Sequence, residues 1–180
     1  MHTALKYLGA LSSCAAVLAI GMASIADSAA QTTNASPVYG VTLPPDYRDW
    51  QLVGVSHVPD GGPNRLKAIL GNPAAIKAMK AGTLPLPDGA MLAKVEWHAE
   101  QHPEQSERVL GEPNTFFPGE RIQLGIMVKD SKKYASTGGW GYGEFVDGKA
   151  LDKATHETCN GCHTAGAGPK NDFVFTHYAR

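Results

Sequence analysis

The chain has 180 residues, of which 18% are charged and 43% hydrophobic, and its formal net charge is −1. These values fit one globular domain with a core of its own and exclude a largely disordered chain. Because neither sign of charge dominates, the bulk electrostatics do not favour nucleic acid or an anionic membrane as a partner. The composition is more consistent with a function that involves a small ligand.

Residues 1–30 have the pattern of a signal peptide. The start is weakly basic, residues 7–25 are almost wholly apolar, and Ser28-Ala29-Ala30 offers small residues for cleavage. A retained spanning helix is disfavoured because the segment is rich in Ala, Gly and Ser. Leu11-Ser12-Ser13-Cys14 resembles a lipidation site, but Cys14 lies inside the apolar run and not at its end. We therefore expect a periplasmic protein with no membrane partner after cleavage.

The mature chain has the pattern of short strands separated by Gly and Pro. Residues 31–43 are expected to form a flexible leader before a domain over residues 44–180. Residues 50–58 and 65–70 are strand candidates. Residues 91–98 alternate, and their apolar face consists of Met91, Ala93, Val95 and Trp97. The most regular strand has apolar side chains at every second position, namely Ile122, Leu124, Ile126 and Val128.

One helix outside the C-terminal region is clearly signalled. Asn72 is a good N-cap, Pro73 suits the first helical position, residues 74–80 favour a helix and Gly82 ends it. With 20 Gly and 12 Pro in the chain, four long amphipathic helices cannot be drawn. The sequence predicts a mainly β, α+β fold, in which an antiparallel sheet is accompanied by a few short helices.

The strongest motif is Cys159-Asn160-Gly161-Cys162-His163, because Cys-x-x-Cys-His is the attachment signature of c-type haem. At helical spacing both thiols face one porphyrin edge, and the imidazole one position further on reaches the iron. Residues 151–157 contain neither Pro nor Gly, which favours a short C-terminal helix that presents the motif. We expect one covalently attached haem c, with His163 as the axial ligand of its iron.

Two further kinds of site fit the motif less well. A structural zinc site needs four ligands, whereas the motif supplies three and the mature chain has no second cysteine pair. A thioredoxin-like pair follows an early strand in a βαβ unit, but this one lies close to the C-terminus. The four-helix cytochromes c′ are excluded by the Gly and Pro content, and no Met follows His163 as in the small helical electron-transfer cytochromes.

Several further side chains are candidates for the haem pocket. Five histidines lack the spacing of a second metal site, although one of them could occupy the sixth coordination position: His57, His98, His102, His156 and His177. Trp140 and Tyr142 share one strand face and belong either to the core or to a wall beside the haem. Phe116, Phe117 and Phe145 are also candidates for the lining of the haem pocket, and the sequence gives no preference among them.

Four segments together resemble the cytochrome P-460 and cytochrome c′-beta family. They are Pro44-Pro45-Asp46-Tyr47-Arg48-Asp49-Trp50, Val128-Lys129-Asp130-Ser131-Lys132-Lys133-Tyr134, the haem pentapeptide and Asp172-Phe173-Val174-Phe175-Thr176. The resemblance implies a β-rich fold, a homodimer and a five-coordinate haem whose distal face is open to small nitrogen species. Members of the P-460 branch oxidise hydroxylamine, whereas the c′-beta branch resembles a nitric oxide binder.

The resemblance also assigns candidate residues around the haem. Lys94 matches the strand lysine that is cross-linked to the porphyrin in the P-460 branch, although the pattern alone favours a solvated lysine. Lys67 or Arg65 stands where the family often has a distal arginine. Ala154 occupies the position from which active members supply a carboxylate, and its acidic neighbours Asp152 and Glu157 are weak substitutes.

Three functions follow, and the sequence leaves them open. The first is oxidation of hydroxylamine, with electrons passed to a partner cytochrome and Lys94 tuning the haem. The second is capture of nitric oxide or another diatomic gas without turnover. The third, plain electron transfer, is the weakest because it requires a second strong axial ligand from an earlier strand.

Overall fold

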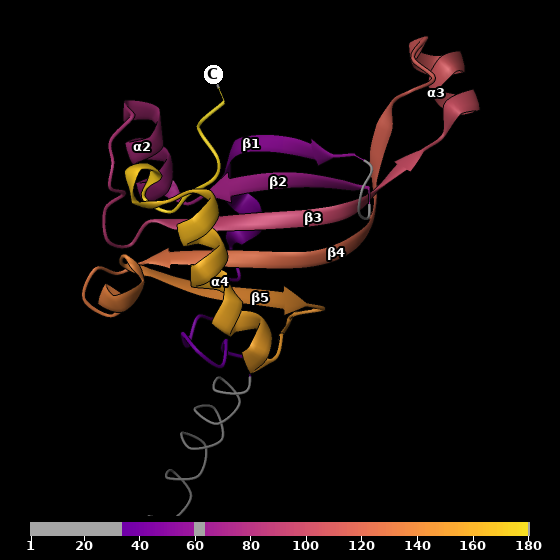
Figure 1. Cartoon of the computed structure of the whole chain (residues 1–180). Coiled ribbons are helices and arrows are strands. Elements are labelled where there is room, and N and C mark those ends of the chain that lie inside the picture. The colour runs from indigo at the N-terminus through magenta and orange to yellow at the C-terminus, as the bar shows by residue number, and fades with distance from the viewer. Residues whose placement is uncertain (1–33, 60–63, 180) are drawn as a thin grey trace, which may run out of the picture. The chain divides into compact units, whose positions relative to one another are not determined.

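The computed structural model describes residues 34–59 and 64–179; the expected signal peptide lies outside them. In this part of the chain one antiparallel sheet has the order β1-β2-β3-β4-β5-β6 (Figure 1). The strands are β1 (Gln51–Val58), β2 (Arg65–Gly71), β3 (Met91–Gln101), β4 (Phe116–Lys129), β5 (Trp140–Val146) and β6 (Lys149–Ala150). The helices are α2 (Pro73–Ala81), α3 (Pro103–Leu110) and α4 (Lys153–Gly166), with the 3-10 turns η1 (Tyr47–Asp49), η2 (Ala135–Thr137) and η3 (Pro169–Asn171). The predicted fold class, including the C-terminal helix, is confirmed.

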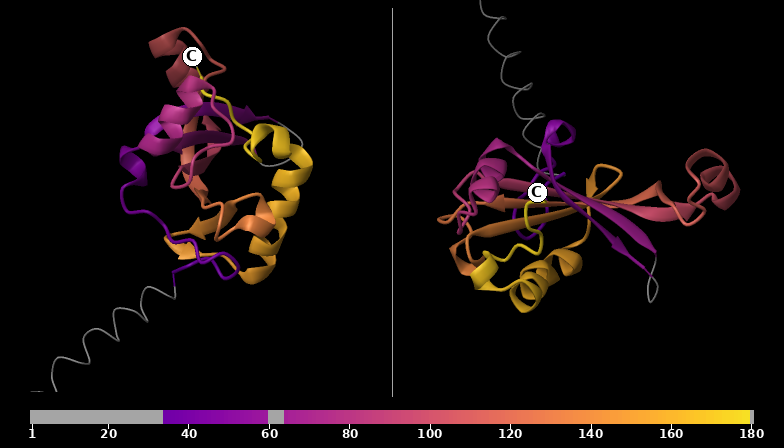
Figure 2. Two further views of the ribbon diagram at one scale, coloured as in Figure 1. Left: turned by 90° about the vertical axis from the view of Figure 1, so that its left-hand side faces the viewer. Right: turned by 90° about the horizontal axis from the view of Figure 1, so that it is seen from above.

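Both faces of the sheet are covered. One face carries Leu92, Trp140 and Tyr142 and packs against α2 and the C-terminal segment. The other carries Ala93, Val95, Leu124, Ile126 and Phe145 and packs against the segment that leads into β1. In the right-hand view of Figure 2, α4 lies on one side of the sheet and that leading segment on the other.

The burial of β3 corrects one expectation from the sequence. Alternation predicts that the face with Leu92, Lys94 and Glu96 is polar and solvated, yet Leu92 is 3% exposed and Glu96 is 1% exposed. Alternation assigns side chains to faces, but it does not reveal that a distant helix covers the second face.

Residues 34–43 correct the expectation of a flexible leader. Ser36 is buried, and its hydroxyl donates a hydrogen bond of 2.8 Å to the carbonyl of Tyr142 in β5. Val41 is also buried and packs in the core on the second face. The polar composition of this stretch conceals two residues that fix it to the sheet, so the folded domain begins before residue 44.

Local signals account for α2 as predicted. The Asn72 side chain accepts a hydrogen bond of 3.0 Å from the backbone N–H of Ala75, and Gly82 ends the helix with a φ of 66°. Helix α3 is absent from the sequence prediction, although Pro103 at its start and Gly111 just after its end are ordinary boundary signals. It lies at the tip of the β3–β4 hairpin, away from the rest of the sheet (Figure 1).

Helix α4 is positioned by its first turn. The Asp152 carboxylate accepts a hydrogen bond of 2.8 Å from the N–H of Thr155, which caps the helix. His156 is fully buried; its Nδ1 donates to the carbonyl of Asp152, and its Nε2 accepts from the N–H of Glu144 in β5. This histidine therefore fixes α4 to the sheet one turn before Cys159. None of the helices in the described residues is long and apolar enough to cross a membrane.

Candidate functional site

A cavity of about 520 Å³ lies between α4, the C-terminal segment and one face of the sheet. Cys159, Cys162 and His163 line it from α4, as their helical spacing predicts, and Lys67 and Lys94 line it from β2 and β3. Its apolar walls include Ile69, Leu92, Met127, Tyr142, Val174 and Phe175. The structure thus brings together the three motif residues and two of the three candidate cations, whereas Arg65 is not among the lining residues.

His163 is held in the form that a metal ligand requires. Its Nδ1 lies 2.7 Å from the carbonyl oxygen of Phe173, and because a carbonyl only accepts, Nδ1 carries the proton and Nε2 is left unprotonated, as a metal ligand must be. Burial lowers the pKa of His163, although the hydrogen bond to Phe173 opposes that shift, so the ring is neutral at neutral pH. The rings of Tyr142 and Phe175 lie 4.9 Å from it, centroid to centroid.

The two thiols are free and differ in exposure. Cys159 is half-buried and Cys162 is exposed. Burial, and secondly the charge of Glu144, raises the pKa of the Cys159 thiol to about 11. It is therefore protonated at neutral pH, which disfavours the thiolate chemistry that would join it to Cys162. Two thiols and a neutral imidazole on one helix, facing an apolar wall of the sheet, fit a covalently attached haem.

A salt bridge crosses the cavity wall above a glycine. Lys94, Gly125 and Glu144 occupy one rung of the sheet on β3, β4 and β5. Lys94 Nζ lies 3.3 Å from Glu144 Oε1, although the two strands are not neighbours. A Cβ at Gly125 would lie 2.9 Å from Glu144 Oε1 and 3.0 Å from Lys94 Cε. The missing side chain at Gly125 is therefore what allows the two charges to meet.

A buried carboxylate organises the cations of β2 and β3. Glu96 Oε1 lies 3.1 Å from Lys67 Nζ and 3.6 Å from Lys94 Nζ, and its Oε2 lies 3.6 Å from Arg65. Burial alone would raise the pKa of Glu96, but Lys94, Lys67 and Arg65 together outweigh it and hold the pKa below its ordinary value. We call Lys67, Lys94, Glu96 and Glu144 the cavity cluster.

The other sequence candidates lie elsewhere in the described residues. Asp152 is the cap of α4, and Glu157 is exposed and pairs with Lys153, so neither lines the cavity. Among the described histidines only His163 lines it. Phe145 is buried on the opposite face of the sheet, and Phe116 lies next to His57 near the far end of β4. Tyr142 is a cavity wall, whereas Trp140 is a core residue.

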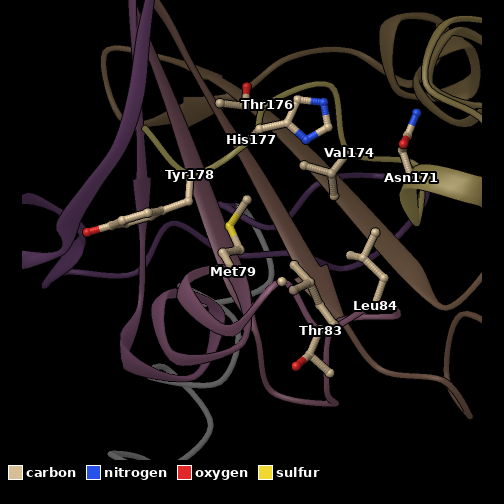
Figure 3. Close-up of a pocket in the computed structure, with 10 residues that line it drawn as sticks. Met79, Thr83, Leu84, Asn171, Val174, Thr176, His177 and Tyr178 are labelled. Carbon is tan, nitrogen blue, oxygen red and sulfur yellow. The ribbon is translucent and has the colours of Figure 1, made fainter. Parts of the chain in front are cut away.

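A second cavity of about 320 Å³ lies beside the first, between α2, the loop that follows it and the C-terminal segment (Figure 3). Val174 and Thr176 line both cavities, so the same short segment is their shared wall. His177 and Met79 line only the smaller one.

Sequence reasoning misses Glu144, Met127 and Phe175 as cavity residues. A signal for Glu144 exists, since it continues the period-two face that begins with Trp140 and Tyr142. Met127 belongs to the polar side of its strand by alternation, although its side chain lines the cavity. The family resemblance implies a carboxylate near Ala154, whereas the acidic residue that lines the cavity is Glu144 in β5.

An antiparallel sheet whose covered face meets a helix bearing Cys-x-x-Cys-His defines a β-sheet cytochrome. The comparison with protein families agrees with this class. The family described as Cytochrome P460 matches residues 44–176, which is most of the chain. The chain belongs to the cytochrome P460 family, which implies a haem cofactor. No curated protein matches the chain.

Proposed function

We propose that the protein is a periplasmic c-type cytochrome that oxidises hydroxylamine and passes the electrons to a partner cytochrome. One haem is joined through thioether bonds to Cys159 and Cys162 and is ligated at iron by His163. The single observation that supports this best is that the motif residues share one cavity with Lys94 and Glu144. When bound, haem supplies the iron at which a small nitrogen compound binds and through which its electrons leave.

The protein residues supply proton transfer and orientation. Oxidation of hydroxylamine releases protons as well as electrons, so a base must lie within reach of the bound substrate. Glu144 is the acidic residue that lines the cavity, and its salt bridge with Lys94 holds the carboxylate in the cavity wall, within reach of a bound substrate. Lys67 provides a cation on the same wall, held by Glu96.

The cavity also favours a second candidate, the capture of nitric oxide without turnover. Ion pairs form with an ammonium and not with a neutral amine, and Lys94 is held by both Glu96 and Glu144. A cross-link to the porphyrin requires the neutral amine, so these pairs favour a lysine that stays unlinked. The apolar walls of Ile69, Leu92 and Met127 would then suit an uncharged diatomic gas.

The proposal includes export of the chain and its assembly into a homodimer. The pattern of residues 1–30 supports secretion. In an oxidising compartment two neighbouring thiols do not stay free, so the attachment of a haem explains why the exported chain has this cysteine pair. The homodimer is proposed from the family resemblance, and the edge strand β1 exposes Leu52 and Val55 as apolar surface for it.

The test is to produce the full chain in a host with cytochrome c maturation machinery and to measure the mass and absorption spectrum of the purified protein. We expect a mass increase equal to one haem that survives denaturation, and loss of that increase in the double variant Cys159→Ser/Cys162→Ser. A colourless protein with the mass of the polypeptide alone contradicts the proposed cofactor.

Turnover of hydroxylamine with an artificial oxidant separates the two functions. An enzyme in which Lys94 is cross-linked to the porphyrin should turn over hydroxylamine and show a red-shifted absorption band in the ferrous state. Both should disappear in Lys94→Ala. Lys77→Ala, which removes an exposed lysine of α2, is the matched control. An ordinary high-spin spectrum with rapid nitric oxide binding and no turnover supports the gas-binding candidate instead.

A further inference from the structure

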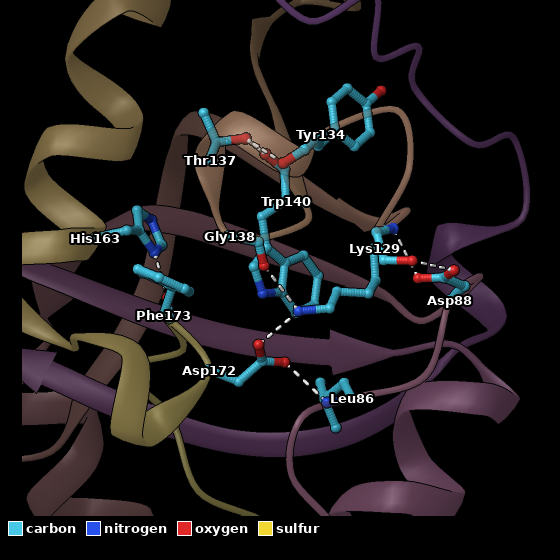
Figure 4. Close-up of polar contacts among 11 residues, drawn as sticks. Leu86, Asp88, Lys129, Tyr134, Thr137, Gly138, Trp140, His163, Asp172 and Phe173 are labelled. Carbon is cyan, nitrogen blue, oxygen red and sulfur yellow. Dashed lines mark hydrogen bonds and ion pairs between the residues drawn. The ribbon is translucent and has the colours of Figure 1, made fainter.

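Behind His163 lies a buried ion pair that the proposed function does not use. Lys129 Nζ contacts Asp172 Oδ1 at 2.5 Å, and each side chain is only 5% exposed. Lys129 also donates to the carbonyl of Gly138 and lies 4.8 Å from the ring centroid of Trp140. Asp172 uses its other oxygen to accept from the N–H of Leu86 at 2.8 Å. We call Lys129 and Asp172 the proximal pair (Figure 4).

The backbone next to this pair has an unusual conformation. Asp172 and Phe173 have φ values of 50° and 60°, in the left-handed region that residues with a side chain seldom adopt. Two consecutive residues of this kind persist only where the surroundings fix them. The Asp172 side chain is fixed by Lys129 and Leu86, and the Phe173 ring lies against Gly138, where a Cβ would come within 2.1 Å of it.

This strained turn directs one carbonyl group at the imidazole. The carbonyl of Phe173 accepts the hydrogen bond from His163 Nδ1, and its direction depends on the backbone angles of Asp172, which belongs to the proximal pair, and of Phe173, which packs on the Gly138 that Lys129 bonds. A hydrogen bond of this kind sets the orientation and basicity of a histidine that ligates a metal. Lys129 and Asp172 touch neither the cavity nor His163 itself.

We propose that Lys129 and Asp172 are positioning residues, which fix the Phe173 carbonyl and thereby set how strongly His163 binds haem iron. The inference rests on the proposed ligation of iron by His163. The pair acts on the iron indirectly. Its two charges neutralise each other, so its effect reaches the iron only through the backbone of Asp172 and Phe173. Releasing the carbonyl weakens the Nδ1–H hydrogen bond and makes the imidazole a poorer donor to iron.

The experiment uses the haem-loaded full chain and the variant Asp172→Asn, which keeps the shape of the side chain and removes its charge. Resonance Raman spectra of the ferrous protein give the iron–histidine stretching frequency, and a titration gives the reduction potential. We expect a lower stretching frequency and a higher potential, because a weaker donor stabilises ferric iron less. Lys129→Met should change the stretching frequency and the potential in the same direction, because it removes the ammonium group that holds the Asp172 carboxylate.

Asp88→Asn is the matched control. Asp88 accepts two hydrogen bonds from Ser131, close in sequence to Lys129, but has no contact with Phe173 in the described residues. It should leave both readouts at the wild-type values. An iron–histidine band that is unchanged in Asp172→Asn, or changed equally by Asp88→Asn, overturns the positioning role while leaving ligation by His163 intact.

The wild-type protein allows a second measurement that needs no variant. If the carbonyl is fixed, the His163 Nδ1 proton should exchange with deuterium far more slowly than that of an exposed histidine such as His98. Exchange at the rate of an exposed ring overturns the proposal. Absence of any iron–histidine band in the wild-type protein overturns both this inference and the ligation on which it rests.

Discussion

The proximal pair and the cavity cluster are two ways in which one small domain buries charge. Lys129 and Asp172 are each 5% exposed, carry equal and opposite charges, and have further hydrogen bonds to fixed groups. In the cavity cluster Glu96 is 1% exposed, but the other three side chains are partly exposed: Lys67, Lys94 and Glu144 are 24%, 31% and 19% exposed. Arg65 adds a further cation beside Glu96, so positive charge is in excess there.

The difference shows how burial decides what a charged group can do. A fully buried, matched pair cannot exchange protons with solvent at low cost, so it serves to hold geometry. In the cavity cluster three of the four side chains are partly exposed, and Glu144 Oε2 is a buried oxygen with no hydrogen-bond partner among the described residues, so it can receive a hydrogen bond from a ligand with little rearrangement. The first arrangement lies behind the imidazole, and the second lines the cavity where a substrate would bind.

Breaking the proximal pair should have the largest effect on stability. Lys129→Met leaves Asp172 charged and buried, and we expect a loss of about 3–5 kcal/mol in the free energy of unfolding, measured with urea. Lys153→Met is the control, because Lys153 forms only an exposed pair with Glu157, worth about 0.5 kcal/mol or less. A loss below about 1 kcal/mol for Lys129→Met would contradict the claim that the proximal pair serves to hold the structure.

Glu144→Gln tests whether the cavity cluster handles protons. The substitution keeps the size of the side chain but removes the base, so kcat for hydroxylamine should fall about 100-fold or more. Stability should change little, because Glu144 is partly exposed. The control is Glu157→Gln, an exposed acid of α4 that lies outside the cavity lining. Unchanged turnover in Glu144→Gln would assign the base to another group.

Acid should weaken the cavity cluster through Glu96. Its folded-state pKa is lowered, so its contribution to stability is present above the unfolded value of about 4.3 and is lost as pH falls through the lower folded value. Unfolding free energies measured between about pH 5 and pH 2 should therefore fall less steeply in Glu96→Gln than in the wild type. Glu104→Gln, at an exposed site in α3, serves as the control. Equal slopes in wild type and Glu96→Gln would refute this assignment.

The smallest effect is expected at Lys67. Lys67→Gln leaves Glu96 with Arg65 and Lys94 as partners, so the free energy of unfolding should change by no more than about 1 kcal/mol. The same urea measurement applies. A loss as large as that of Lys129→Met would show that the cavity cluster is as tightly coupled as the proximal pair.

Local signals predict the parts of this protein that depend on neighbours in sequence. The spacing from Cys159 to His163, the cap at Asn72 and the alternation along β4 each describe a few adjacent residues, and the structure contains the elements they predict. The cofactor bonds themselves remain a prediction. The assignment of Lys94 to the cavity comes from the family resemblance, since its strand pattern alone indicates solvent.

The remaining features depend on residues brought together by topology. Glu144 meets Lys94 across an intervening strand, which requires both the strand order and a glycine at position 125. Lys129 and Asp172 are 43 residues apart, and each looks like an ordinary surface charge in its own segment. Burial of the leader at Ser36 likewise depends on a carbonyl of β5.

The bond between His156 and the backbone of Glu144 has a mechanical consequence. It joins the helix that bears both thiols to the strand that bears the carboxylate, so a displacement of one relative to the other would have to break this buried hydrogen bond. Lys67, by contrast, belongs to β2, whose outer neighbour is the edge strand β1. Fluctuations that begin at the edge of the sheet would therefore displace the cations before they change the distance from the carboxylate to the imidazole.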